Sequence, residues 1–359
     1  MNWSDRRLIE LFGMDHPIVQ APMAGFVSPA MVVAVSEAGG LGSIAGAMAT
    51  PESLRTELQV VRQGTGRSFS VNFFTHRQPE PDAAREQRWR QRLAPFYREF
   101  GLPADAGAGP VRLAPFDAAL CDVVLEFKPK VASFHFGLPE AGLVKRLKDE
   151  RIAIVSTATT AAEARWLEGE GVDAVIAQGA EAGGHRGMFL VDDIARQAGT
   201  MALVPQVVDA VKVPVIAAGG IGDGRGIAAA LALGAAGVQM GTAFLLTPEA
   251  RTPALHRAAL KQADDGSTTL TNLFTGRPAR AIVNRYIEEV GPMNADAPQF
   301  PLAAGASGPL RAASEAKGSS DFMPLWSGQA PSLAREMPAG DLIALLTRET
   351  EAALRRVQG

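Results

Sequence analysis

A histidine in a glycine-rich loop is the residue of this chain best placed to do chemistry. Residues 178–187 (QGAEAGGHRG) bring His185 in just after residues 173–177 (DAVIA), an apolar run that predicts a buried strand. Glycines let a backbone approach a ligand that side chains would keep away. Core histidines usually lie on apolar faces, whereas an imidazole in such a loop can exchange protons near neutral pH. We therefore expect His185 to be catalytic.

Two later strand ends offer backbone donors suited to a phosphate group. Residues 217–224 (AAGGIGDG) lead into an apolar helical pattern, and residues 239–242 (QMGT) follow the next predicted strand. Backbone N–H groups at a helix N-terminus attract phosphate, and in barrels the loops after strands seven and eight often bind it. Tight turns alone could also explain these glycines. Because no first strand of a Rossmann unit precedes them, a mononucleotide fits better than a dinucleotide.

Three side chains at other strand ends suit a flat ring lying over the same mouth. Asn72 and Gln178 carry amides that can donate to or accept from the pyrimidine edge of a flavin. Asn72 stands in an apolar run and must find a hydrogen-bond partner. Met23 could stack on the ring or be ordinary core.

The elements that must position these residues alternate in type from residue 16 to residue 244. Short β-branched runs alternate with longer helical patterns, which indicates repeated βα units around a parallel sheet. Ser28-Pro29, Thr50-Pro51 and Thr159-Thr160 are helix start signals. Eight strands favour a closed (β/α)8 TIM barrel over an open sheet. They are predicted at residues 17–23, 41–45, 68–74, 131–136, 152–157, 174–178, 214–218 and 237–244.

Two segments break this alternation. Residues 76–112 indicate a βα-loop insertion in the barrel, and residues 247–334 a small, mainly helical inserted subdomain near the active-site mouth. Within the latter, residues 302–320 are rich in Ala, Gly and Ser, a composition typical of a mobile segment. An amphipathic pattern after Asp341 predicts the eighth outer helix. We therefore expect the barrel to comprise residues 1–246 and 335–359.

Composition restricts the class of partner. The 359 residues are 47% hydrophobic and 20% charged, with a net charge of −3, so neither nucleic acid nor a membrane surface is indicated as a partner and a small molecule is. The single Cys121 cannot form an internal disulfide, and no signal peptide is apparent, which favours the cytoplasm. We expect no metal site, because no cluster of ligand residues has the required spacing. A monomer and a homodimer remain equally open.

Motifs spread over nearly the whole chain resemble those of class I nitronate monooxygenases, formerly called 2-nitropropane dioxygenases. These are FMN enzymes on a TIM barrel. The matching segments are residues 20–25 (QAPMAG) continuing to Gly42, 133–139 (SFHFGLP), 157–159 (TAT) with Glu163-Ala164, 178–187, Gly219-Gly220 and 239–242.

The resemblance implies a role for each matching residue. His185 would be the catalytic histidine, with His135 and Lys317 at the substrate. The family pattern also has tyrosines near that lysine, but this chain has only Tyr97 and Tyr286, so substrate fit could differ. His16, His76 and His256 are assigned no role. FMN would be held by Met23, Asn72, Gln178, Gly183, Gly220, Gln239, Met240, Gly241 and Thr242.

The implied reaction is oxidation of alkyl nitronates, propionate 3-nitronate above all, by O₂ to a carbonyl compound and nitrite, which would detoxify them. A protonated His185, with His135, would stabilise the anionic substrate. With a neutral nitroalkane, His185 would act as general base. The alternative is an FMN-dependent NAD(P)H reductase of the enoyl-acyl-carrier-protein or quinone type, which NADH oxidation would reveal.

Overall fold

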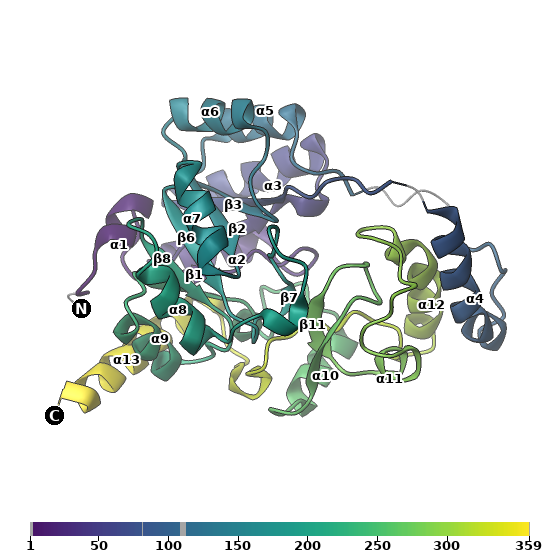
Figure 1. The fold of residues 1–359 in the computed structure, drawn as a ribbon. Helices are drawn as coiled ribbons and strands as arrows, with labels where there is room; N and C mark the ends of the chain where they lie inside the picture. The colour runs from purple at the N-terminus through teal and green to yellow at the C-terminus, as the bar shows by residue number, and fades with distance from the viewer. Residues whose placement is uncertain (1–2, 81, 108–112, 359) are drawn as a thin grey trace.

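The computed structural model describes residues 3–80, 82–107 and 113–358 (Figure 1). Eight parallel strands form one sheet, in which each strand is hydrogen-bonded to the next. The sheet closes because Val19 forms a parallel bridge to Leu41, where Leu41 N donates to Ile18 O at 3.0 Å. The predicted TIM barrel is confirmed. In spatial order the strands are β1 (Ile18–Gln20), β9 (Gly237–Met240), β8 (Val215–Ala218), β6 (Ala174–Gln178), β5 (Ala153–Ala158), β4 (Val131–His135), β3 (Phe69–Phe74) and β2 (Gly42–Ala45).

Two of the predicted strands extend too far at their C-terminal ends. The segment expected as one strand at residues 237–244 splits into β9 and a 3-10 turn, η3 (Thr242–Phe244), and the segment at 17–23 keeps only three strand residues. After the last bond between β1 and β9, from Ala21 N to Met240 O at 2.8 Å, both segments leave the barrel and line the mouth. Apolar composition alone therefore does not mark where pairing stops.

Alternate strand residues face opposite sides of the barrel wall. Ile18 and Val175 belong to an outer apolar layer, whereas Val19 and Ile176 belong to an inner one. The inner layer also contains Leu8 and Phe12 of α1 (Arg7–Phe12), together with Trp3 and Met14. This N-terminal segment therefore packs into the barrel interior, and the opposite, carboxyl ends of the strands carry the open mouth.

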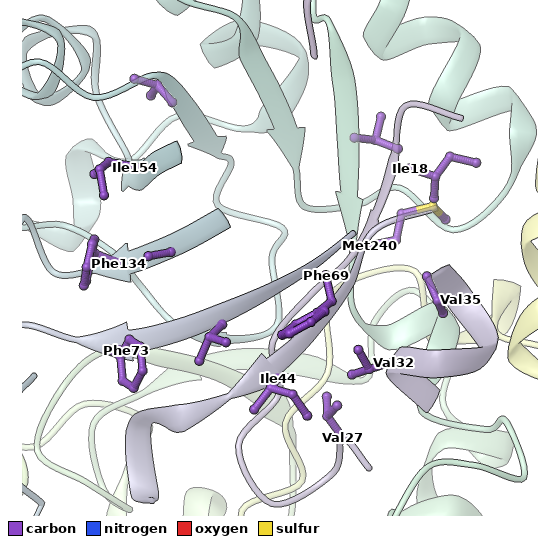
Figure 2. Packing of buried hydrophobic residues seen from close by; sticks show 14 of the residues in the cluster. Ile18, Val27, Val32, Val35, Ile44, Phe69, Phe73, Phe134, Ile154 and Met240 are labelled. Carbon is purple, nitrogen blue, oxygen red and sulfur yellow. The ribbon is translucent and has the colours of Figure 1, made fainter. Parts of the chain in front are cut away.

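The outer layer packs beneath eight helices. Figure 2 shows part of it, with Val32 and Val35 of α2 beside the strands that carry Ile18 and Ile44. The C-terminal helix packs against α2 and α9, as expected for the eighth outer helix. The three expected start signals are side-chain caps, at Ser28, Thr50 and Thr160. The outer helices are α2 (Pro29–Glu37), α3 (Pro51–Gly64), α5 (Ala118–Phe127), α6 (Ala141–Asp149), α7 (Ala161–Gly169), α8 (Thr200–Val208), α9 (Gly224–Ala232) and α13 (Ala339–Gln358).

The segment expected as a barrel-loop insertion lies between β3 and α5 and packs against the subdomain. Figure 1 shows α4 (Ala83–Glu99) beside α12, at the far side of the molecule from α1. Its Trp89, Phe96 and Tyr97 are buried with Tyr286 and Phe322 in a separate apolar cluster. Residues 108–112 of this insertion lie outside the described residues. The two insertions therefore share one small core.

The subdomain is helical apart from a small antiparallel sheet. Residues expected to be mobile, 302–320, contain the long helix α12, because alanine favours helix and Leu310 is buried against α4 and its neighbours. In the sheet, β11 lies between β10 and β7, a two-residue strand that carries His185. The domain limits at residues 247 and 334 stay a prediction. The remaining elements are β7 (Gly184–His185), α10 (Ala254–Gln262), β10 (Thr268–Thr271), β11 (Ala279–Ile282), α11 (Arg285–Val290) and α12 (Ala303–Ala316).

Candidate active site

One cavity of about 630 Å³ opens at the carboxyl ends of the barrel strands, under the subdomain. This volume lies within the roughly 300–1,000 Å³ typical of small-molecule sites. The barrel contributes residues at or directly after the ends of seven strands, and the subdomain contributes the opposite wall, which includes Phe274 and Trp326. The site is therefore built between the barrel and its insertion, as is common for ligand sites.

His185 lines this cavity from the short strand β7. Its backbone pairs with Ala279 of β11, so the subdomain sheet fixes the strand that carries it. Its Nε2 lies 2.9 Å from Thr275 Oγ1. Aromatic rings pack around the imidazole, with ring centroids 5.3 Å away for Phe300 and 5.4 Å away for Trp326. The imidazole therefore stands in an apolar wall with one hydrogen-bonded nitrogen.

His135 also lines the cavity, but both of its nitrogens are bonded to protein. Its Nε2 lies 3.1 Å from the carbonyl oxygen of His185, which accepts, so Nε2 carries the hydrogen. Its Nδ1 is then the acceptor for the Thr157 hydroxyl at 3.0 Å. The ring therefore holds the His185 strand in place and presents carbon atoms, not a free nitrogen, to a substrate.

Gln178 makes the same kind of bond to this loop. Its Nε2 donates to His185 O at 3.0 Å, and its Oε1 accepts from Gly187 N at 2.8 Å. The side chain lines the cavity, yet its amide is committed to the loop. Gln178 thus orients the histidine before it meets any ligand.

Both imidazoles are neutral at pH 7. The pKa of His185 is lowered to about 3, chiefly by burial and in addition by the nearby His135 ring and Arg277 guanidinium. Burial likewise lowers the pKa of His135 to about 3, against the raising effect of its bond to His185 O. The apolar wall therefore disfavours the imidazolium that was expected at His185.

A buried arginine, Arg186, and a half-buried one, Arg277, supply positive charge close to this pair. Arg186 is fully buried and donates to Gly179 O at 2.5 Å and Gln178 O at 2.7 Å. Arg277 donates to Met188 O, and its guanidinium lies 3.8 Å from the centre of the Phe136 ring. Burial lowers the pKa of each arginine to about 10, so both remain cationic. Within the described residues neither forms an ion pair, so their field is not cancelled by contact with a carboxylate.

The helix N-terminus that was expected to bind phosphate is already occupied by two carboxylates of the protein. The Asp223 carboxylate accepts from Arg225 N at 2.9 Å and Gly226 N at 3.3 Å, and the Glu349 carboxylate accepts from Gly224 N at 3.1 Å. These carboxylates already cap the first turn of α9. These N–H groups were expected to be free donors, but Asp223 is itself the N-cap residue of α9 and accepts from two of them.

Free donors lie instead on three cavity-lining glycines. Across the described residues, the N–H groups of Gly183, Gly220 and Gly241 have no acceptor. Gly220 has a φ of +70°, where an L side chain is strained. A Cβ on Gly219 would lie 2.9 Å from Ala182 N. The chain thus keeps a side-chain-free cradle of N–H groups, which fits a phosphate.

The other residues expected to hold a flavin all line the cavity, and they differ in how far their side chains are buried or already hydrogen-bonded. Asn72 is buried, and its Nδ2 donates to Ser133 Oγ at 2.9 Å. Thr242 Oγ1 accepts from Gly328 N at 2.9 Å. Met240 is buried in the outer layer, so it offers backbone. Met23 and Gln239 are half-buried. This set matches a flat, mostly apolar ring with a polar edge.

Lys317 is not part of the cavity wall. It follows α12 on the exposed side, with its Nζ 4.5 Å from the centre of the Phe100 ring. Tyr97 and Tyr286 are likewise away from the site, in the core of the subdomain. Arg311, one helical turn and a half earlier on α12, lines the cavity instead. The expectation failed at this point because helix phase, not sequence distance, selects the inward face.

Sequence reasoning missed the wall that the subdomain provides. Thr275, Phe300 and Trp326 surround His185, and Phe274 lines the cavity beside them. They come from segments separated by up to 141 residues from the histidine (326 − 185). No local signal marks them, because residues 247–334 are no richer in aromatic residues than the chain as a whole.

Two absences apply to the part of the chain that the structure describes. No group of three or more His, Cys, Asp or Glu side chains could hold a metal ion there. No helix in that part is long and apolar enough to cross a membrane.

A TIM barrel with a donor cradle and a histidine at its mouth defines an enzyme acting on small molecules. More specifically, the chain belongs to the nitronate monooxygenase family, whose model matches residues 5–349. It is 43% identical to a nitronate monooxygenase of Pseudomonas aeruginosa over 96% of this chain and 98% of that protein. The protein is thus an oxidoreductase of a flavoenzyme family, and its reaction is the oxidation of nitronates.

Solved structures agree with this assignment. A nitroalkane oxidase from Streptomyces ansochromogenes superposes with a TM-score of 0.88 at 40% identity, covering 98% of this chain and all of that one (100%). FabK from Thermotoga maritima superposes with a TM-score of 0.73 at 28% identity, covering 98% of each chain.

Proposed function

We propose that this protein uses FMN to oxidise alkyl nitronates, propionate 3-nitronate among them, with O₂, and releases a carbonyl compound and nitrite. The observation that carries the proposal is the position of His185, which opens into the same cavity as the free N–H groups of Gly183, Gly220 and Gly241. A cofactor phosphate in the cradle would place its ring system along the lining that leads to the histidine. Removal of nitronates would be the physiological result.

The residues present fit FMN. The cradle would take the phosphate, and the half-buried Met23 and Gln239 would border the ring. When bound, FMN supplies the electron transfer between nitronate and O₂. The protein would bind and orient the substrate and exclude water.

The protein's own groups suit an anionic substrate. Phe300 and Trp326 exclude water around His185, which strengthens electrostatic interactions in the site. The cationic Arg186 and Arg277 lie close behind the loop that carries the histidine. A nitronate carries its negative charge on the two nitro oxygens, so a neutral imidazole N–H and this positive field would both favour its binding.

The test uses the FMN-loaded protein with propionate 3-nitronate. We expect nitrite release and O₂ consumption that begin on substrate addition, and a large loss of both in His185→Asn with FMN retained. His16→Asn is the matched control, because His16 does not line the cavity. Rapid NADH oxidation with no nitrite release would assign the protein to the reductase alternative.

A further inference from the structure

Thr275 is the side chain that bonds directly to the catalytic histidine. Its Oγ1 lies 2.9 Å from His185 Nε2, and both residues line the cavity. Thr275 comes from the turn between β10 and β11, so this bond ties the subdomain hairpin to the histidine. Neither the motifs nor the resemblance pointed to it.

The turn around Thr275 is held rigidly. The preceding Phe274 is buried, and the following Gly276 donates its N–H to Asn272 O at 2.8 Å. Gly276 has a φ of +90°, and a Cβ there would run into Pro298 O. The hydroxyl is therefore presented to the histidine from a fixed backbone, as a positioning group requires.

The surroundings of this pair favour one direction of the hydrogen bond, from the Thr275 hydroxyl to His185 Nε2. In the described part of the chain, Thr275 Oγ1 has no second partner, so His185 Nε2 is the one acceptor available to its hydrogen. His185 Nδ1 has no protein partner either, and it is not among the enclosed unpartnered atoms, so it is open to the cavity. If the hydroxyl donates to Nε2, a neutral imidazole must carry its hydrogen on Nδ1.

We propose that Thr275 is a positioning residue that holds His185 as the Nδ1–H tautomer, so that the histidine donates a hydrogen bond into the cavity. This inference rests on the proposed function and specifies its substrate class. The group that best accepts from Nδ1–H is an anionic oxygen, as in a nitronate, and a charge-assisted hydrogen bond of this kind is about twice as strong as a neutral one.

The tautomer also disfavours the other class of substrate. Proton abstraction from a neutral nitroalkane needs a bare ring nitrogen facing the cavity. With Nδ1 protonated and Nε2 engaged by Thr275, no such nitrogen is available without turning the hydroxyl. The enzyme should therefore act on preformed nitronates far better than on the parent nitroalkanes.

The experiment reads the tautomer and the kinetics separately. Long-range ¹H–¹⁵N spectra of the FMN-loaded protein, labelled on histidine, distinguish Nδ1–H from Nε2–H, and His185→Asn assigns the resonance. The variants are Thr275→Val, which keeps the shape and removes the hydroxyl, and Thr275→Ser, which restores it. Thr269→Val on the same hairpin is the control, because its hydroxyl forms no side-chain hydrogen bond among the described residues.

We expect Nδ1–H at His185 in the unaltered protein, in Thr275→Ser and in Thr269→Val. Thr275→Val should gain the Nε2–H form and lose about tenfold in kcat/KM for ethyl nitronate, as expected when one hydrogen bond is lost. The same protein should oxidise nitroethane much more slowly than ethyl nitronate.

Two results would overturn the inference. One is an Nε2–H tautomer in the unaltered protein, and the other is a Thr275→Val protein with unchanged tautomer and unchanged kcat/KM. If Thr275→Val does not fold, the spectrum of the unaltered protein and its preference for nitronates over nitroalkanes still test the inference. A protein that oxidises no nitronate refutes the proposed function, whereas the spectrum tests the tautomer independently.

Discussion

Replacement of Gly241 by alanine should separate cofactor binding from folding. Gly241 has a φ of −111°, which alanine can adopt. A Cβ built there meets only ordinary contacts, at 3.5 Å from Ala21 Cβ and 3.6 Å from Met23 Sδ. Both neighbours line the cavity, so the added methyl group would occupy the space between the ends of β1 and β9. The fold should tolerate the methyl group, while a phosphate in the cradle should not.

The size of the effect follows from the bonds that the methyl group displaces. Glycine-to-alanine at a compatible position stabilises a fold by about 0.4–1 kcal/mol, because the unfolded chain loses freedom. A hydrogen bond to a charged group contributes about 1.5–3 kcal/mol. Loss of one such bond to phosphate raises the Kd for FMN by roughly 10–150-fold.

The assay is titration of the apoprotein with FMN, followed by quenching of FMN fluorescence, beside thermal unfolding of the apoprotein. Gly66→Ala is the control, since Gly66 is exposed and a Cβ there meets nothing within 4 Å. We expect unchanged or higher unfolding temperatures in both variants and weaker FMN binding in Gly241→Ala alone. Unchanged FMN affinity in Gly241→Ala would refute the placement of the phosphate.

Three further predictions follow from burial. Arg186→Met should lower the free energy of unfolding by at least about 3 kcal/mol, because it removes the buried guanidinium donors to Gln178 O and Gly179 O and leaves Gly179 O only its bond from Ala182 N, and urea denaturation measures this. Stability should also fall as the pH drops from 6.5 towards 4, by at most about 1.4 kcal/mol per pH unit for each of three histidines. In the native state burial lowers the pKa of His135 and His185 to about 3 and that of His256 to about 4, so only the unfolded chain takes up protons in that range; urea midpoints that stay constant with pH would contradict this. Burial raises the pKa of the Cys121 thiol, so a thiol reagent should react with it only after unfolding, and rapid labelling of the native protein would show that the helix α5 opens.

The sequence predicted the barrel well because its signals are local. Each strand is a short apolar run that ends at a turn, and Ser28, Thr50 and Thr160 cap helices as their types suggest. The parallel arrangement followed from the βα alternation, since parallel neighbours need a crossover helix. The loops around His185 and Gly220 were predicted for the same reason, because a glycine at the end of a strand indicates a local backbone conformation or a close approach that other residues disfavour.

Predictions failed where a distant segment decides the outcome. The packing of the 76–112 insertion was not predicted: Trp89 and Tyr97 are buried with subdomain residues, and no local pattern identifies that partner. The Ala-rich stretch at 302–320 was expected to be mobile, yet it forms a helix because α4 packs against it. Lys317 was expected at the substrate, but the phase of that helix places it outside.

The sequence by itself determined which residues reach the mouth of the barrel: the His185 loop, the donor glycines and the polar strand ends. Only the tertiary structure decided their chemical state. The subdomain brings Thr275 to His185 Nε2 and the Phe300 ring to its side. Desolvation by such neighbours keeps the imidazole neutral. This burial depends on every element that packs around the histidine, whereas a sequence motif predicts only its own local conformation.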